Sequence, residues 1–164
     1  MNNRFEILED YLINPRTSML LPARHIEYET IVIEQDKQFL VQKTALELME
    51  RACSKYGAKF DGRRKSVMEQ TGYKRRVPIP VSIRFDIYAF PTHAIKDRDC
   101  MWIFGNHVHH VERMPPVKQG GKEKSLAVFR NGLEVELEVS QHTLEEQLRR
   151  TEECRYVFTE GVFT

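Results

Sequence analysis

The sequence predicts an α+β fold, a mainly antiparallel sheet built of hairpins with two or three helices. Short β-branched and aromatic runs such as residues 28–33 are separated by turn residues. Two Thr-x-x-Glu capping boxes, at Thr44 and Thr143, precede apolar residues at helical spacing. Asn131-Gly132 lies between two runs of alternating apolar and polar residues, the pattern of a hairpin.

At 164 residues the chain is long enough to bury a core, and we expect residues 1–164 to form a single domain. No apolar run approaches membrane-spanning length, and the first residues lack the apolar segment of a secretion signal. We therefore expect a cytoplasmic protein without membrane contact. Cys53, Cys100 and Cys154 lie roughly fifty residues apart, which favours reduced thiols over a disulfide framework or a zinc knuckle.

The N-terminal third is expected to begin as antiparallel sheet. Residues 11–13 and 19–21 flank residues 14–17 in the manner of a first hairpin. The β-branched run over residues 28–33 and the apolar pair at residues 39–40, with a polar connection between them, predict a second hairpin.

A helix over residues 45–56 is the best-specified element. It begins at the capping box of Thr44 and Glu47, and Gly57 ends it. Cys53 on its apolar stripe is interpreted as a small core residue rather than a nucleophile, because no partner histidine lies at a recognisable motif distance. The apolar residues at helical spacing are Leu46, Met49, Cys53 and Tyr56.

Cationic side chains concentrate between residues 51 and 76. This stretch holds nine cationic and two acidic side chains, a net charge of +7, whereas the whole chain carries +1. Such segregation creates a local field for an anionic partner, and a phosphate backbone is the obvious one. A solvated surface and a different anionic ligand are the alternatives. The cations are Arg51, Lys55, Lys59, Arg63, Arg64, Lys65, Lys74, Arg75 and Arg76.

A short helix is predicted within this stretch, over residues 62–71. Asp61 is a suitable N-cap, and Gly72 is a suitable residue to end the helix. The first turn then carries Arg63, Arg64 and Lys65, whose positive charges oppose the helix dipole. A phosphate bound to the free amides of that turn would remove the conflict.

Three extended segments are expected beyond the basic stretch. Two prolines hold residues 77–81 extended, and we predict that this segment is a stiff spacer. Alternating apolar residues predict a half-buried strand over residues 83–90. A further strand is predicted over residues 101–113, with Trp102 as a core anchor.

Asn106, His107 and His109 lie close together in the last of these strands. In a strand, His107 and His109 would share one face. They could bind zinc if Cys100, His93 or a carboxylate supplied further ligands, but none stands at a diagnostic spacing. The alternatives are plain surface histidines and a polar face on which Asn106, His107 and His109 contact nucleic acid.

The last third is predicted to contain a loop, a hairpin and a helix. Residues 115–124 include two prolines and two glycines and are expected to form the loop. The hairpin over residues 126–139 is expected to use a type I′ turn at Asn131-Gly132, and its three alternating glutamates should repel nucleic acid. The final helix is expected to start at the capping box of Thr143 and to run to about Arg155.

Taken in order, these features resemble the ComK family of competence transcription factors from Gram-positive bacteria. The resemblance covers roughly residues 11–156. It depends on the order and spacing of several pieces rather than on any single one. The pieces are Tyr56-Gly57 after the capped helix, the basic motif at Gly62-Arg63, the extended prolines, Phe90-Pro91-Thr92, Cys100-x-Trp102-Ile103, His107-Val108-His109 and the Asn131-Gly132 hairpin.

The resemblance implies a DNA-binding transcription activator of competence and DNA-uptake genes. It implies recognition of paired A/T-rich boxes in double-stranded promoter DNA, largely through the minor groove, by a dimer or higher assembly. RNA polymerase is a further expected partner. Longer family members carry a C-terminal extension, whereas the printed chain ends at Thr164, so adaptor-mediated proteolysis attributed to that extension is not carried over.

Narrow A/T-rich minor grooves have an enhanced negative potential that attracts arginine. Arg63 and Arg64 are therefore the candidates for insertion into the groove. The candidates for flanking phosphate contacts are Lys59, Lys65, Lys74, Arg75 and Arg76.

Two other classes of function compete with this one. The first is a metal-dependent enzyme that uses His107 and His109 on an anionic substrate. The second is an RNA-binding module that stacks bases on Tyr56, Phe60 and Tyr73. Because the sequence has no nucleotide-binding glycine loop, no nucleophile motif and no paired catalytic carboxylates at recognisable spacing, we expect no catalysis, no cofactor and no resident metal.

Overall fold

The computed structural model describes residues 6–115 and 119–160. The helices are α1 (Ala45–Lys55), α2 (Phe60–Thr71) and α3 (Gln141–Glu160). A short 3₁₀ turn, η1, spans Gly105–His107. The strands are β1 (Ile7–Leu8), β2 (Thr17–Pro22), β3 (Thr30–Glu34), β4 (Lys37–Val41), β5 (Ile79–Ser82), β6 (Ile87–Pro91), β7 (Trp102–Phe104), β8 (Val108–Met114), β9 (Lys124–Phe129) and β10 (Glu134–Leu137).

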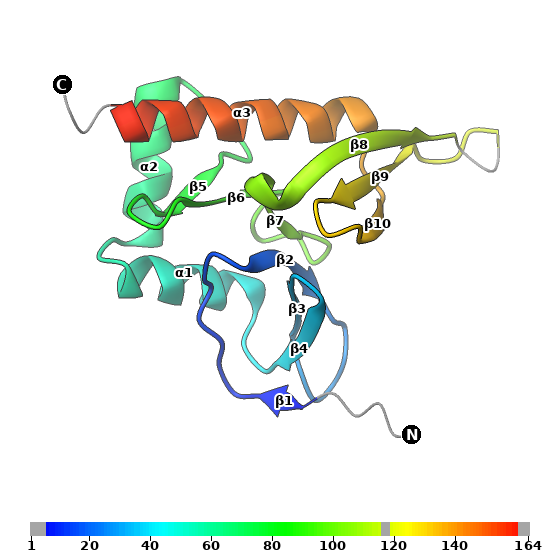
Figure 1. The fold of residues 1–164 in the computed structure, drawn as a ribbon, viewed down its shortest axis with the longest axis horizontal. Helices are drawn as coiled ribbons and strands as arrows, with labels where there is room; N and C mark the ends of the chain where they lie inside the picture. Colours follow the sequence, from blue (N-terminus) through cyan, green and yellow to red (C-terminus); the bar gives the residue numbers. More distant parts are fainter. Residues whose placement is uncertain (1–5, 116–118, 161–164) are drawn as a thin grey trace.

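Ten strands form two sheets within the described residues. Seven strands lie in the order β1-β4-β3-β2-β7-β6-β5, and the other three lie in the order β10-β9-β8 (Figure 1). The pairs are antiparallel except β1 with β4, which is parallel. The prediction of an α+β fold with a mainly antiparallel sheet is confirmed. None of the helices in this part of the chain has the length and apolar character that a bilayer span requires.

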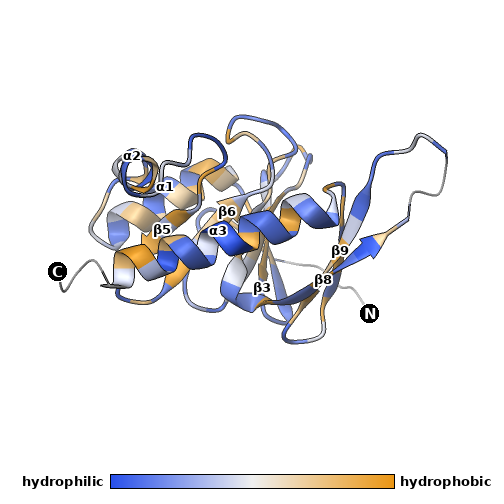
Figure 2. Cartoon of the chain, turned by 90° about the horizontal axis from the view of Figure 1, so that it is seen from above, coloured by the Kyte–Doolittle hydropathy of each residue, from blue (hydrophilic) through white to orange (hydrophobic). Residues whose placement is uncertain are grey.

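Most of the seven-stranded sheet is covered on both faces, since strands β2, β3, β5, β6 and β7 are buried along most of their length. Neighbouring strand residues alternate between two buried clusters, so that Leu20 packs with α1 and α2 while Met19 packs toward the three-stranded sheet. Helix α3 contacts β6 of the large sheet as well as β8 and β9 of the small one. Figure 2, seen from above, shows α3 crossing in front of both sheets. Burial of both faces explains why these strands are rich in apolar residues.

The first predicted hairpin is wrong. Strand β2 already pairs with β3 on one edge and with β7 on the other, so no edge remains for residues 11–13. These residues are held instead by single contacts: the Tyr11 hydroxyl donates to Glu34 at 2.5 Å, and the Tyr56 hydroxyl donates to the Ile13 carbonyl at 2.7 Å. The second predicted hairpin is confirmed as β3 and β4, joined at Gln35, which has a φ of 53°.

Helix α1 is confirmed with both bonds of its capping box, between Thr44 and Glu47. Helix α2 differs from its prediction, because it begins at Phe60 with Lys59 as a cap that makes no side-chain hydrogen bond. Asp61 as N-cap is therefore wrong. Phe60 is buried edge-on against Trp102, with ring centroids 5.9 Å apart. Because this packing holds Phe60 in the first turn, α2 begins two residues before the predicted start. The predicted end at Gly72 is confirmed by its φ of 79°.

The segments after the basic stretch also differ from expectation. Residues 77–81 are not a spacer, because β5 is a fully buried edge strand of the large sheet. Residues 83–86 form a turn rather than strand, and Asp86 has a φ of 58°. Trp102 is confirmed as a core residue, with 1% of its surface exposed.

The single strand predicted over residues 101–113 is wrong. It is broken at Gly105–His107, which sends β7 into the large sheet and β8 into the small one. His107 therefore lies in the 3₁₀ turn, and a bulge follows between Val108 and His110. As a result, His107 and His109 do not share a strand face.

In the last third, the hairpin of β9 and β10 is confirmed. Its type I′ turn is wrong, since among the described loop residues only Gly132 has a positive φ, 91°, and type I′ requires two. The predicted loop at residues 115–124 extends over residues 116–118, which lie outside the described part. Helix α3 starts earlier than predicted, because Ser140 rather than Thr143 is its cap, and it continues past Arg155.

Candidate nucleic-acid interface

The basic stretch forms one wall of a cleft. Its volume is about 380 Å³, and four cationic side chains and four apolar residues line it. No carboxylate is among these lining residues, all of which belong to the described chain. We call this feature the cationic cleft. Its lining residues are Arg64, Lys74, Arg75, Arg76, Val77, Ile79, Ala94 and Ile95.

Helix α2 supplies Arg64 to the cationic cleft. Its neighbour Arg63 is half-buried, and the Arg63 Nε atom is enclosed without a hydrogen-bond partner among the described residues. Arg63 also lies near α1, where burial raises the pKa of the Cys53 thiol to about 11 against the opposing effect of the Arg63 charge. Cys53 is therefore a protonated core thiol at neutral pH.

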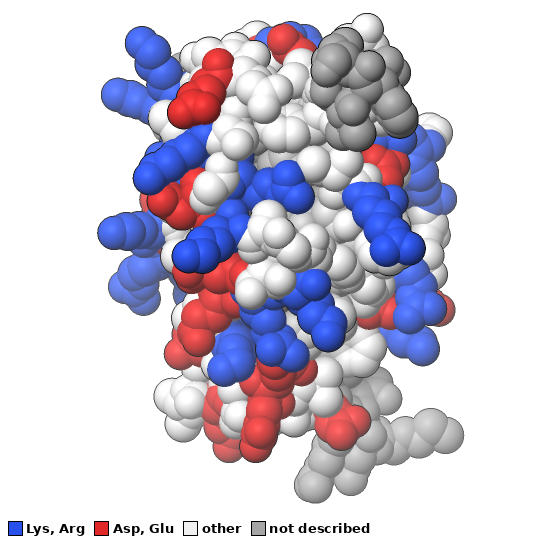
Figure 3. Space-filling model, turned by 90° about the vertical axis from the view of Figure 1, so that its left-hand side faces the viewer, with Lys and Arg blue, Asp and Glu red and all other residues white. Residues whose placement is uncertain are grey.

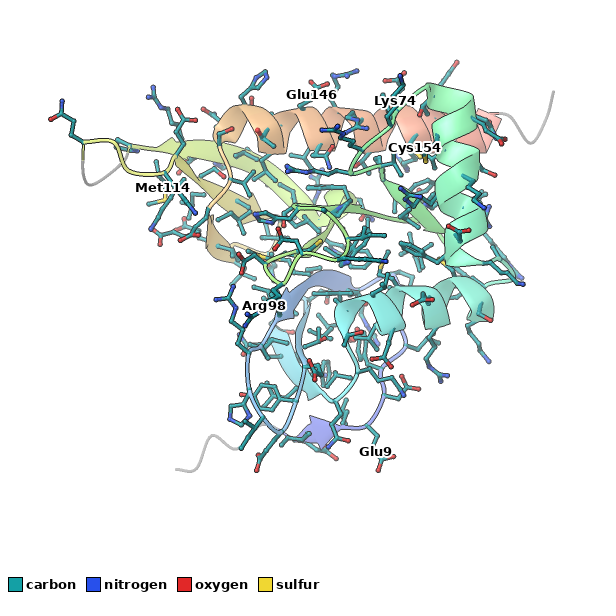
Figure 4. The ribbon with its side chains drawn as sticks, turned by 180° about the vertical axis from the view of Figure 1, so that it is seen from behind. Glu9, Lys74, Arg98, Met114, Glu146 and Cys154 are labelled. Atoms are coloured by element: carbon teal, nitrogen blue, oxygen red, sulfur yellow. The ribbon has the colours of Figure 1, made fainter. Side chains whose placement is uncertain are left out.

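The other three cations of the cleft come from the loop after α2. Gly72 adopts the left-handed conformation that ends the helix and turns the chain. The exposed residues Lys74, Arg75 and Arg76 follow, and Arg76 itself has a φ of 49°, which is uncommon for a residue with a side chain. In Figure 4 the labelled Lys74 lies beside α2 and α3.

Helix α3 supports this loop through residues that the sequence analysis did not single out. Gln147 donates to the Arg76 carbonyl at 2.9 Å, and Arg150 donates to the Arg75 carbonyl at 3.0 Å. The Arg150 guanidinium also lies 4.1 Å from the centre of the Tyr73 ring. No sequence signal could have found these contacts, because each joins residues more than seventy positions apart.

The remaining predicted cations lie outside the cleft. Arg51 pairs with Asp10 at 2.6 Å, and Lys65 pairs with Asp61 at 3.1 Å. Lys55 and Lys59 are exposed and make no ion pair within the described residues. The face that α2 presents carries many lysine and arginine side chains, with acidic ones between them (Figure 3). Around the cationic cleft, in contrast, four cations gather with no carboxylate among the described lining residues.

Asn106, His107 and His109 do not join this cleft. Asn106 and His107 lie in η1 and His109 lies at the start of β8. Strand β8 is separated from α2 in Figures 1 and 2. His107 Nε2 is 2.7 Å from the Pro15 carbonyl oxygen, and the Nδ1 atoms of His109 and His110 are 2.7 Å apart. Within the described residues, no group of three or more His, Cys, Asp or Glu side chains is placed to hold a metal ion.

The three aromatic residues predicted to stack on RNA bases are engaged within the protein. Tyr56 bonds to Ile13, Phe60 packs on Trp102, and Tyr73 lies under Arg150. Their rings are already in contact with other side chains or fixed by a hydrogen bond. This arrangement does not favour a stacking surface for single-stranded RNA.

Fold and site define the class of the protein: an α+β protein whose candidate site is a cationic cleft of arginine and lysine. A family model described as "ComK protein" matches residues 8–162, so the chain belongs to the ComK family. The "Competence transcription factor" of Bacillus subtilis (strain 168) is 31% identical over 157 residues, which cover 94% of this chain and 78% of that protein. The resemblance seen in the sequence is confirmed. No solved structure matches the chain.

Proposed function

We propose that this protein is a DNA-binding activator of competence gene transcription and that the cationic cleft is its main contact with the DNA backbone. The observation that supports this most directly is the gathering of Arg64, Lys74, Arg75 and Arg76 around one cleft without a carboxylate. Membership of the ComK family and the name of the Bacillus subtilis relative point in the same direction. The role is non-enzymatic and requires no cofactor.

The chemistry of the cleft suits phosphate oxygens. Arginine presents a planar fork of N–H donors that can bind two phosphate oxygens at once, and lysine adds a point charge. Three of the four cations are consecutive in one loop, so they can follow successive phosphates of a strand. Lys55, Lys59 and Arg63 would extend this contact along α1 and α2.

The proposed target is duplex DNA with paired A/T-rich boxes, read largely through the minor groove by a dimer or higher assembly. Consecutive residues on a helix point about 100° apart, so the side chains of Arg63 and Arg64 leave α2 in different directions. We assign insertion to Arg64, because it lines the cleft while Arg63 has its Nε enclosed. We further propose that residues 1–164 act as one domain. RNA polymerase is a further proposed partner.

A salt-dependent titration tests the proposal. The purified protein is titrated on a duplex with two A/T-rich boxes in helical phase and on a G/C-substituted duplex of equal length. We expect selective, cooperative binding to the first duplex, with an affinity that falls with log salt at a slope of about −5 if six phosphates are contacted. Arg64→Ala should weaken binding to the A/T-rich duplex more than to the control.

Lys37→Ala is the matched control, because it removes the same charge from an exposed position on β4 rather than from the cleft. Equal and weak binding to both duplexes would overturn sequence-selective recognition. Better binding to single-stranded RNA would favour an RNA-binding module instead. Stoichiometric zinc in the purified protein would support the alternative of a metal-dependent enzyme, which the placement of side chains in the described residues does not favour.

A further inference from the structure

The loop that carries Lys74, Arg75 and Arg76 is fixed through its backbone by α3. The Gln147 Nε2 atom donates to the Arg76 carbonyl at 2.9 Å, and the Arg150 Nη2 atom donates to the Arg75 carbonyl at 3.0 Å. Because main-chain carbonyl groups accept both bonds, these bonds constrain the shape of the loop without engaging the side chains of Arg75 and Arg76.

Gln147 connects this loop to the large sheet. It is 4% exposed, and its Nε2 atom also donates to the Pro91 carbonyl at 3.0 Å, at the end of β6. Its Oε1 atom accepts from Arg150 Nη1 at 2.8 Å. Both polar ends of a buried amide are therefore satisfied, which gives the side chain one preferred orientation.

Arg150 is held on three sides. It bonds to Gln147 and to the Arg75 carbonyl, and its guanidinium lies over the Tyr73 ring. The Tyr73 hydroxyl in turn donates to Glu153 of α3. Tyr73 thus connects the beginning of the loop to α3, while Gln147 holds its end.

The loop adopts a conformation that it would not prefer by itself. Arg76 has a φ of 49°, and left-handed backbone at a residue with a side chain persists only where the surrounding structure imposes it. The bond from Gln147 to the Arg76 carbonyl is the direct restraint, and the Arg76 side chain reaches the Thr92 carbonyl at 3.4 Å.

We infer that Gln147 and Arg150 are positioning residues that hold Lys74, Arg75 and Arg76 as one preformed set of phosphate contacts. This inference rests on the proposed DNA-binding function. A preformed set binds more tightly because its ordering is completed before the partner arrives. Loss of the support should therefore weaken the phosphate contacts of Lys74, Arg75 and Arg76 together. This loss would exceed what the charge of the substituted residue explains, because Gln147 is uncharged and Arg150 is a single cation.

The test compares salt dependence among folded variants of the full chain, on the A/T-rich duplex. Arg150→Ala removes the support. Arg150→Lys keeps the charge but replaces the planar guanidinium, whose two Nη atoms make separate bonds, with a single ammonium nitrogen. Tyr73→Leu removes the stacked ring without changing the charge. Arg149→Ala is the matched control, because Arg149 pairs with Glu146 and Glu153 and makes no bond to the loop backbone. Thermal melts establish that each variant is folded at the binding temperature.

We expect the salt slope to fall by about 2 or more with Arg150→Ala, since each lost phosphate contact lowers it by about 0.9. Arg150→Lys and Tyr73→Leu should also reduce the magnitude of the salt slope, whereas Arg149→Ala should leave it near the wild-type value. If Arg150→Ala does not fold, the comparison of Arg150→Lys with Tyr73→Leu carries the test.

Two results would overturn the inference while the proposed function stands. In the first, Arg150→Lys binds as tightly as wild type, which makes Arg150 a simple phosphate contact. In the second, Tyr73→Leu leaves the slope unchanged, which shows that the loop does not need its support. A wild-type protein that does not bind the duplex would instead overturn the proposed function, and the inference with it.

Discussion

Helices α1 and α2 follow each other in the chain, yet they are stabilised in different ways. Helix α1 starts at a complete capping box and buries one face, which consists of Leu48, Met49, Ala52 and Cys53. Helix α2 has no side-chain cap and buries only Phe60 and Val67. The first helix is defined by its own sequence, and the second depends on where the rest of the fold places it.

The two helices also differ in how many of their positions are free to carry charged side chains. The apolar face of α1 contributes to the core beneath the large sheet, so few of its positions are free to change. Helix α2 buries little, and most of its surface can carry cations such as Arg64 without disturbing the core. A helix that contributes less to the core is a suitable place for the cations of the proposed DNA contact.

Substitutions at the buried residues of α1 and α2 should have the largest effect on stability. Leu48→Ala in α1 should lower the free energy of unfolding by about 3 to 4 kcal/mol, because it leaves a cavity at a fully buried site. Val67→Ala in α2 removes two methyl groups and should cost about 2 kcal/mol. Urea denaturation measures both values. A larger loss for Val67→Ala would mean that α2, not α1, is the main scaffold.

A pH titration tests whether the buried face of α1 is dry. Burial raises the pKa of the Cys53 thiol from 9.0 to about 11 in the folded protein. Folding favours the neutral thiol, so the Cys53 thiol contributes fully to the free energy of unfolding below about pH 9. This contribution falls by about 2 kcal/mol as the pH rises to 11. Denaturation of wild type and Cys53→Ala across this range measures it, and parallel pH profiles for the two proteins would contradict the prediction.

The smallest effect concerns the two helix starts. Thr44→Ala should lower stability by about 1 kcal/mol, because it removes a cap that α1 uses. Lys59→Ser should raise stability by about 0.5 to 1 kcal/mol, since the backbone of Lys59 is already extended and serine can cap from it.

The same Lys59→Ser variant should bind DNA less well. If Lys59 contacts a phosphate, the magnitude of the salt slope should decrease by about 0.9. Opposite signs for stability and binding in one variant would sharpen the contrast between the helices. Increased stability with unchanged binding would remove Lys59 from the interface.

Some elements could be predicted from the sequence because their causes are local. The capping box of Thr44 lies within three residues of its partner, and Gly72 ends α2 through its own backbone freedom. The hairpin of β9 and β10 follows from alternation around a glycine turn. The concentration of cations near Arg64 is likewise visible in the chain itself, as is the resemblance to the ComK family.

Other features depend on competition between distant segments. Residues 11–13 have the composition of a strand, but β7 occupies the edge of β2 that they would need. The strand expected over residues 101–113 divides at Gly105–His107, because its two halves pack into different sheets. Pattern alone cannot show which of several possible partners a strand will take.

The cationic cleft shows the same limit at the site. Charge density along the chain is a local property, so the basic stretch could be identified residue by residue. The selection of Arg64, Lys74, Arg75 and Arg76 from nine cations arises only when α2 and the loop after it come together with residues 94–95. The bond from Gln147 to this loop forms only because α3 packs beside it. Such contacts join residues far apart in sequence, and their free energy depends on the burial that the whole fold provides.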